Sequence, residues 1–116
     1  MAARARLAAT EIFFEYDRAT PTPEGERALQ QAAADLLKFP GINFTLEGHA
    51  DDRGTATYNK ALGLRRAEAV MRILVKAGVA FERMKLVSQG EMRPEVPKKD
   101  DRSRAVNRRV VFTGLQ

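Results

Sequence analysis

The sequence contains no cysteine and a single histidine, His49. Without cysteine, the chain has no disulfides, thiolate metal ligands or thiol nucleophiles, and the redox state of its compartment is left open. No apolar run approaches the roughly 18 residues that a transmembrane helix needs. The first nine residues also lack the continuous apolar stretch of a signal peptide. From these absences, a cytoplasmic protein and part of an exported protein both remain open.

The length of 116 residues and the 44% hydrophobic content are typical of one globular domain with a modest core. A net charge of +5 suggests an anionic partner. However, the densest basic groups, between residues 98 and 109, are interrupted by Asp100 and Asp101. Aromatic residues are not interleaved with the basic ones, as a surface that binds single-stranded nucleic acid would require. The composition therefore argues against nucleic acid as the partner.

The hydrophobic pattern predicts four strands and two long helices in the order β-α-β-α-β-β. Thr22 is a good N-cap residue, with Pro23 at the first helical position, and Gly78 can end the second helix. Alternation with a period of two marks the second strand. The predicted strands are 11–16, 42–47, 85–89 and 108–112, the helices are 23–38 and 57–77, and a short helical turn is expected at 102–106 after a loop at 91–101.

These elements predict an α/β (α+β) fold, a two-layer sandwich with the helices on one face of a four-stranded mixed sheet. Both crossovers are long enough to carry helices, so the first three strands can be parallel. Each helix has one apolar stripe; in the first helix Asp35 is expected to face water. Residues 11–113 form the predicted domain, and residues 1–10 an N-terminal extension or linker.

Arg66 is an anomaly in the second helix. At 100° per residue it falls in the middle of the apolar stripe that contains Val70 and Leu74, whereas Arg65 falls outside it. A buried guanidinium needs carboxylate or carbonyl partners. One interpretation is structural: Arg66 extends to the surface near the helix start or pairs with a structural acid.

The other interpretation is a ligand site. The first turns of the second helix should lie beside the carboxyl ends of the first two strands, where α/β sheets usually bind ligands. Asp17 follows the first of these strands and Asp51 the second. An arginine binds a carboxylate through a flat fork, and aspartates bind an ammonium group. The three side chains together therefore suit a zwitterion that resembles the end of an amino acid.

Catalysis is not predicted. His49 with its acidic neighbours is a weak metal signal and is interpreted as a residue that shapes the loop. Ser88 and Ser103 do not lie in a nucleophile-elbow sequence. Asp51 and Asp52 are adjacent in a loop, where neighbouring side chains usually point apart. The glycines match neither a dinucleotide nor a phosphate loop, so we expect no catalytic residue, no metal and no cofactor.

The loop and the second helix resemble the signature of the outer-membrane protein A C-terminal-like family. The matching segments are Gly48-His-Ala-Asp-Asp-Arg-Gly54, Tyr58-Asn59, Leu62-Gly63, Arg66-Ala67 and Val70, with Phe14-Glu-Tyr-Asp17, Ser88-Gln-Gly90 and Asn107-Arg-Arg-Val110 outside them. The resemblance covers roughly residues 11–113. The form of the first segment resembles most the peptidoglycan-associated lipoprotein branch, although the acylated cysteine of that branch is missing.

The resemblance implies non-covalent binding of peptidoglycan through the diaminopimelate residue of its stem peptide. In the family, the positions of Asp51 and Arg66 hold this residue. Asp17 and Tyr16 match the contribution of the first strand to the pocket, and Asn59, Leu62 and Arg108 are further lining candidates. Replacing Arg66 with Ala is then expected to abolish binding while the domain stays folded.

The resemblance also implies a periplasmic, outer-membrane-associated protein that tethers an envelope component to the cell wall. Membrane contact is expected only through an anchor outside this chain, and envelope proteins such as a Tol-type system are candidate partners. The main alternative is a protein–protein docking domain of the envelope that has lost wall binding. A hydrolase that acts on the wall is the third reading.

Overall fold

The computed structural model describes residues 2–90 and 101–116. Its helices are α1 (Ala2–Ala9), α2 (Pro23–Lys38), α3 (Ala56–Lys76) and α4 (Asp101–Asn107), with a 3-10 turn at Phe81–Arg83. Its strands are β1 (Glu11–Phe13), β2 (Phe44–His49), β3 (Met84–Gly90) and β4 (Arg109–Thr113). The predicted elements are all present, in the predicted order. Residues 91–100 of the predicted loop lie outside the described residues.

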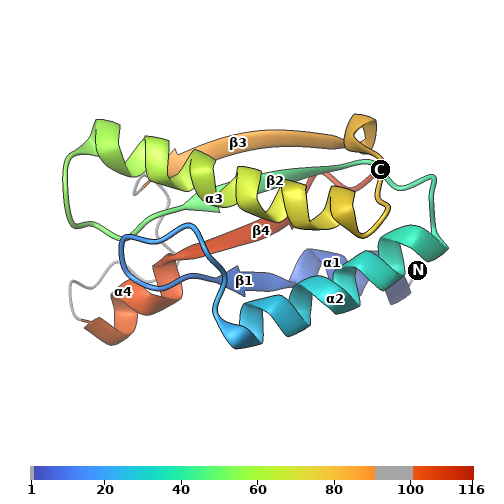
Figure 1. The fold of residues 1–116 in the computed structure, drawn as a ribbon, viewed down its shortest axis with the longest axis horizontal. Coiled ribbons are helices and arrows are strands. Elements are labelled where there is room, and N and C mark those ends of the chain that lie inside the picture. Colours follow the sequence, from blue (N-terminus) through green and yellow to red (C-terminus); the bar gives the residue numbers. More distant parts are fainter. Residues whose placement is uncertain (1, 91–100) are drawn as a thin grey trace.

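The four strands form one mixed sheet in the order β1-β4-β2-β3. β4 is antiparallel to both β1 and β2, and β2 is parallel to β3. The first three strands therefore run in the same direction, as predicted. The last strand of the chain lies between β1 and β2, so the carboxyl ends of these two strands are separated by the start of β4 (Figure 1).

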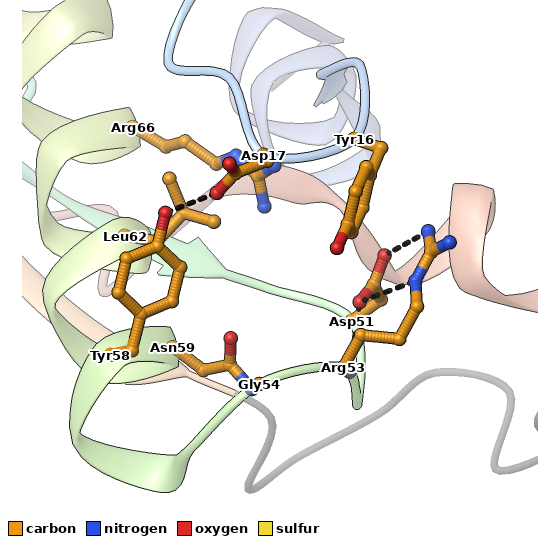
Figure 2. A pocket seen from close by; sticks show the side chains of 9 residues that line it. All are labelled: Tyr16, Asp17, Asp51, Arg53, Gly54, Tyr58, Asn59, Leu62 and Arg66. Carbon is orange, nitrogen blue, oxygen red and sulfur yellow. Dashed lines mark hydrogen bonds and ion pairs between the residues drawn. The ribbon is translucent and has the colours of Figure 1, made fainter.

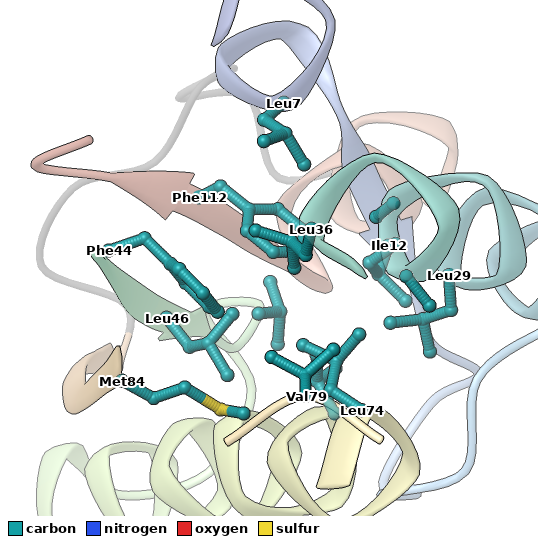
Figure 3. Packing of buried hydrophobic residues seen from close by; sticks show 14 of the residues in the cluster. Leu7, Ile12, Leu29, Leu36, Phe44, Leu46, Leu74, Val79, Met84 and Phe112 are labelled. Atoms are coloured by element: carbon teal, nitrogen blue, oxygen red, sulfur yellow. The ribbon is translucent and has the colours of Figure 1, made fainter. Parts of the chain in front are cut away.

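Helices α2 and α3 pack on one face of this sheet, which confirms the predicted two-layer arrangement (Figure 1). Leu46 of β2 pairs in register with Phe112 of β4, and both side chains are buried in this layer. The rings of Phe44 and Phe112 lie 5.4 Å apart, centroid to centroid. The core between helices and sheet is continuous and apolar (Figure 3).

The segment expected to be an N-terminal extension or linker, residues 1–10, contains α1. This helix contacts β4 and α2, and it buries Ala3 and Leu7. Asp35 is therefore only 6% exposed, contrary to the prediction that it faces water. Arg6 of α1 covers it, with Nη2 donating to Oδ1 at 2.7 Å and Nε to Oδ2 at 3.0 Å. The hydrogen bond from Arg6 lowers the pKa of Asp35.

Leu7→Ala is expected to lower the free energy of unfolding by about 2 kcal/mol, because the Leu7 side chain is fully buried in the core. Urea denaturation followed by circular dichroism measures the change. Arg4→Ala on the exposed side of α1 is the matched control, with an expected change within about 0.5 kcal/mol. Equal stability of the two variants would mean that α1 does not dock in solution.

All four strands differ from their predicted bounds, β3 and β4 by one residue at each end and β1 and β2 by more. β1 ends at Phe13 rather than Tyr16, since Phe14 makes only an isolated bridge to Pro21 before the chain turns. β2 begins two residues later than predicted and includes His49, which was expected in the loop. His49 is buried at the end of the ladder with β3, and its Nε2 lies 2.8 Å from Glu47 Oε1.

Within residues 2–90 and 101–116, no helix combines the length and the apolar character that crossing a membrane requires.

Candidate functional site

A pocket of about 120 Å³ lies where the loop after β1, the loop after β2 and the first turns of α3 meet (Figure 2). The predicted ligand site was at this edge of the sheet. Nine residues line the pocket: Tyr16, Asp17, Asp51, Arg53, Gly54, Tyr58, Asn59, Leu62 and Arg66.

Close backbone packing brings α3 to this place. A Cβ atom at Gly48 of β2 would lie 1.8 Å from the carbonyl oxygen of Gly63 in α3, so glycine is required for this approach. Thr55 caps the helix, and its side chain accepts a hydrogen bond from the Tyr58 backbone N–H at 3.0 Å. Spacings of four residues then align Tyr58, Leu62 and Arg66 on the face that lines the pocket.

Arg66 is fully buried, at 0% exposure, which confirms the prediction from the helical periodicity. Its guanidinium donates to three backbone carbonyls: Nε to Arg18 at 2.8 Å, Nη1 to His49 at 2.9 Å and Nη2 to Glu15 at 3.0 Å. Of its five N–H groups, two are not used by these bonds to described residues, one on each terminal nitrogen. Burial, followed by the charge of Arg108, lowers the Arg66 pKa to about 10, so the side chain stays charged at neutral pH.

Asp51 is 4% exposed and carries two arginine partners. Arg53 donates its backbone N–H to Oδ1 at 3.0 Å and its Nη2 to Oδ2 at 2.9 Å, and Arg108 donates Nη1 to Oδ2 at 3.2 Å. Burial acts to raise the pKa of Asp51, but the hydrogen bonds from Arg53 and Arg108 outweigh it and the pKa is lowered. Asp51 is therefore a carboxylate at neutral pH.

The outer rim of the pocket is aromatic. Tyr58 donates its hydroxyl to Asp17 Oδ1, a contact that joins α3 to the loop after β1 (Figure 2). Asp17 has a φ of 55°, in the left-handed region, where aspartate is one of the better-tolerated residues. The guanidinium carbon of Arg53 lies 3.7 Å from the centroid of the Tyr16 ring. Both tyrosines are about half exposed.

Six of the seven residues predicted for the site line this one pocket; their role in binding stays a prediction. The seventh, Arg108, is not in the lining. It supports the pocket from behind, because its Nε donates to the carbonyl of Phe14 at 2.9 Å while its Nη1 holds Asp51. Three lining residues were missed: Arg53, Gly54 and Tyr58. All three lie within the quoted motif, and Tyr58 precedes Leu62 by one helical turn, which was the available signal.

Other acids and the histidine lie elsewhere. Asp52, next to Asp51, points away and accepts a hydrogen bond from Arg104 Nε at 2.7 Å. The His49 side chain lies against Glu47, and neither residue is in the pocket lining. In the described part of the chain, no three histidine or acidic side chains are grouped so that they could hold a metal ion.

The sequence matches the OmpA family over residues 13–108, and the chain belongs to this family. It is 50% identical over 103 residues to the peptidoglycan-associated lipoprotein of Pseudomonas aeruginosa, covering 89% of this chain and 61% of that protein. The protein of the same name from Agrobacterium fabrum is 41% identical over 100 residues, covering 86% of this chain and 56% of the relative. The chain thus spans less than two thirds of these curated relatives.

Solved structures agree with the fold. The crystal structure of the peptidoglycan-associated lipoprotein from Burkholderia pseudomallei superposes with a TM-score of 0.88 at 37% identity, covering 96% of this chain and 93% of that one. The C-terminal domain of Helicobacter pylori MotB gives a TM-score of 0.82 at 22% identity, covering 91% and 83%, and supports the fold alone. The predicted fold class is confirmed.

Proposed function

We propose that this domain binds peptidoglycan without catalysis, through the diaminopimelate residue of the stem peptide. The observation that carries the proposal is that one pocket is lined by both a buried guanidinium, that of Arg66, and a buried carboxylate, that of Asp51. The end of diaminopimelate presents a carboxylate and an ammonium group on one carbon. Each of these two groups of the ligand therefore finds a partner of opposite charge in the pocket.

The carboxylate of the ligand is assigned to Arg66, which has one remaining N–H on each terminal nitrogen after its bonds to Glu15, Arg18 and His49. The ammonium group is assigned to Asp51 and Asp17. Tyr58 and Leu62 then contact the aliphatic part of the ligand. Since Arg66 is fully buried, side chains that line the pocket, which include the joined Tyr58 and Asp17, have to move before the ligand reaches it.

Peptidoglycan as the polymer is supported by the names of the relatives, which are peptidoglycan-associated lipoproteins. On the same support, we place the full-length protein in the periplasm, associated with the outer membrane, as a tether to the cell wall. A Tol-type partner stays a prediction from the family resemblance, because no described contact bears on it.

The test is calorimetric titration with a tripeptide stem ending in diaminopimelate, alongside the stem ending in lysine. Lysine lacks the distal carboxylate assigned to Arg66, so we expect the lysine stem to bind at least tenfold more weakly. Equal affinity for both stems would contradict the role of Arg66.

A second candidate, an envelope protein-docking domain, is favoured by one observation. Asp51 is already engaged by Arg53 and Arg108 within the chain, as in a site that serves only the fold. Such a domain would stay folded and bind neither stem, and it would not sediment with purified sacculi. Sedimentation with sacculi together with binding of the diaminopimelate stem would rule this candidate out.

A further inference from the structure

Arg53 occupies the place at Asp51 that the proposed function gives to the ammonium group of the ligand. Its Nη2 lies 2.9 Å from Asp51 Oδ2, and its Nε lies 3.4 Å from Oδ1. Asp51 is 4% exposed, so little of the carboxylate is left for a second cation to approach. A ligand with an ammonium group therefore meets a site that already holds a cationic side chain.

The two arginines on Asp51 differ in how firmly they are held. The side chain of Arg108 is 12% exposed, and its Nε is fixed to the Phe14 carbonyl at 2.9 Å. The side chain of Arg53 is 31% exposed and belongs to the loop between β2 and α3. It also stacks on Tyr16, which is itself half exposed. Arg53 is the partner that can leave without disturbing the sheet.

We propose that Arg53 is a built-in competitor, whose guanidinium is exchanged for the ammonium group of the ligand at Asp51. This inference rests on the proposed function, and it adds a residue that sets affinity and specificity. The exchange is neutral in charge, because one cation replaces another beside the same carboxylate. Ligands without an ammonium group at this position leave Arg53 in place and gain nothing from Asp51.

The backbone geometry keeps Asp51 ordered during the exchange. The backbone N–H of Arg53 donates to Asp51 Oδ1 at 3.0 Å, and this bond does not depend on the side chain at position 53. Arg108 continues to donate to Oδ2. The guanidinium now lies 3.7 Å from the centroid of the Tyr16 ring, so it has to shift from this position to release Asp51. Removing the Arg53 side chain should therefore leave Asp51 ordered, with Arg108 still bound and the place of Arg53 open to another cation.

Arg53→Gln is expected to lower the Kd for the diaminopimelate stem by roughly two- to fivefold, the range that partly exposed ion pairs span. Arg53→Lys keeps the charge but loses the forked, stacked geometry, so a smaller gain in the same direction is expected. Calorimetric titration measures both variants against the unaltered chain. A merely structural role for Arg53 would weaken binding or leave it unchanged.

Two controls isolate the exchange. Arg104 forms an ion pair with Asp52, the neighbour of Asp51, and neither Arg104 nor Asp52 lines the pocket. Arg104→Gln removes the same charge as Arg53→Gln and should change Kd by less than twofold. A stem ending in 2-aminopimelate keeps the distal carboxylate and lacks the distal amine. For this stem, Arg53→Gln should give no gain, so the difference between the two stems is the coupling between position 53 and the ammonium group.

The outcomes separate the two proposals. Tighter binding by Arg53→Gln, confined to the diaminopimelate stem, supports both. If the unaltered chain binds this stem and Arg53→Gln binds it equally or more weakly, the proposed function stands and the competitor is overturned. If the unaltered chain fails to bind and Arg53→Gln binds, the role of Arg53 as a competitor is supported, and Arg53 blocks the site in the unaltered chain. If neither binds, both proposals are overturned.

Discussion

Arg66→Met is expected to abolish detectable binding of the diaminopimelate stem and to lower the free energy of unfolding by about 2–4 kcal/mol. Binding is lost because the methionine cannot hold the carboxylate of the ligand. Stability is lost because the carbonyls of Glu15, Arg18 and His49 lose their hydrogen-bond donor. Relief of the desolvation of Arg66, the cause of its lowered pKa, offsets part of that cost.

The two effects have to be measured separately. Urea denaturation gives the stability, and titration is done at a temperature where the heteronuclear NMR spectrum shows that the variant is folded. Arg66→Lys keeps the charge but not the planar fork. We therefore expect this variant to lose affinity for the stem as well as free energy of unfolding. Arg72→Met, an exposed position on the same helix, is the control and should change neither. A folded Arg66→Met variant that retains the affinity would contradict the assignment.

The sequence predicted that the domain stays folded when Arg66 is lost, and the three carbonyl bonds add the expectation that it is then less stable. The periodicity of α3 correctly predicted that this arginine is buried, because a charge in the middle of an apolar stripe is visible without a structure. It left open whether the partners were carboxylates or carbonyls. That choice depends on where the loop after β1 crosses α3, and the sequence contains no local signal for the path of a loop.

The helix α1 was missed for a related reason. Its eight residues are mostly alanine and arginine, and only Ala3 and Leu7 are buried, so no apolar stripe stands out. The burial of Asp35 could not be foreseen either, since it depends on Arg6 reaching it from α1. The position of β4 between β1 and β2 is likewise a tertiary choice, and strand order is not encoded in the period of any single strand.

The sequence predicted the position of the pocket, but not the contacts that its charged residues make within the chain. Asp17 and Asp51 were placed together because they follow strands that point to the same edge of the sheet, and the structure brings both to one pocket. What sequence reasoning could not supply was the occupancy of Asp51 by Arg53 and Arg108. Pairings of this kind depend on rotamers of long side chains, and several arginines of this chain were equally available by sequence.

The whole site depends on how closely α3 approaches β2, and Gly48→Ala tests this directly. The added Cβ would lie 1.8 Å from the carbonyl oxygen of Gly63 and 2.6 Å from its carbon. Both are backbone atoms, so the helix and the strand have to move apart. We expect the free energy of unfolding to fall by about 3 kcal/mol or more, at the upper end of overpacking in protein cores.

Two other glycines calibrate this result by urea denaturation. Gly41→Ala has no atom within 4 Å of the added Cβ, so it should be neutral or slightly stabilising, by up to about 1 kcal/mol. Gly63→Ala meets the Ser88 side-chain oxygen at 2.3 Å, and part of its cost should disappear in a Ser88→Ala background. If Gly48→Ala were as stable as Gly41→Ala, the contact between β2 and α3 would be loose. The hydrogen bond from Arg66 to the His49 carbonyl, which helps to form the pocket, would then not be held in place by close packing of α3 on β2.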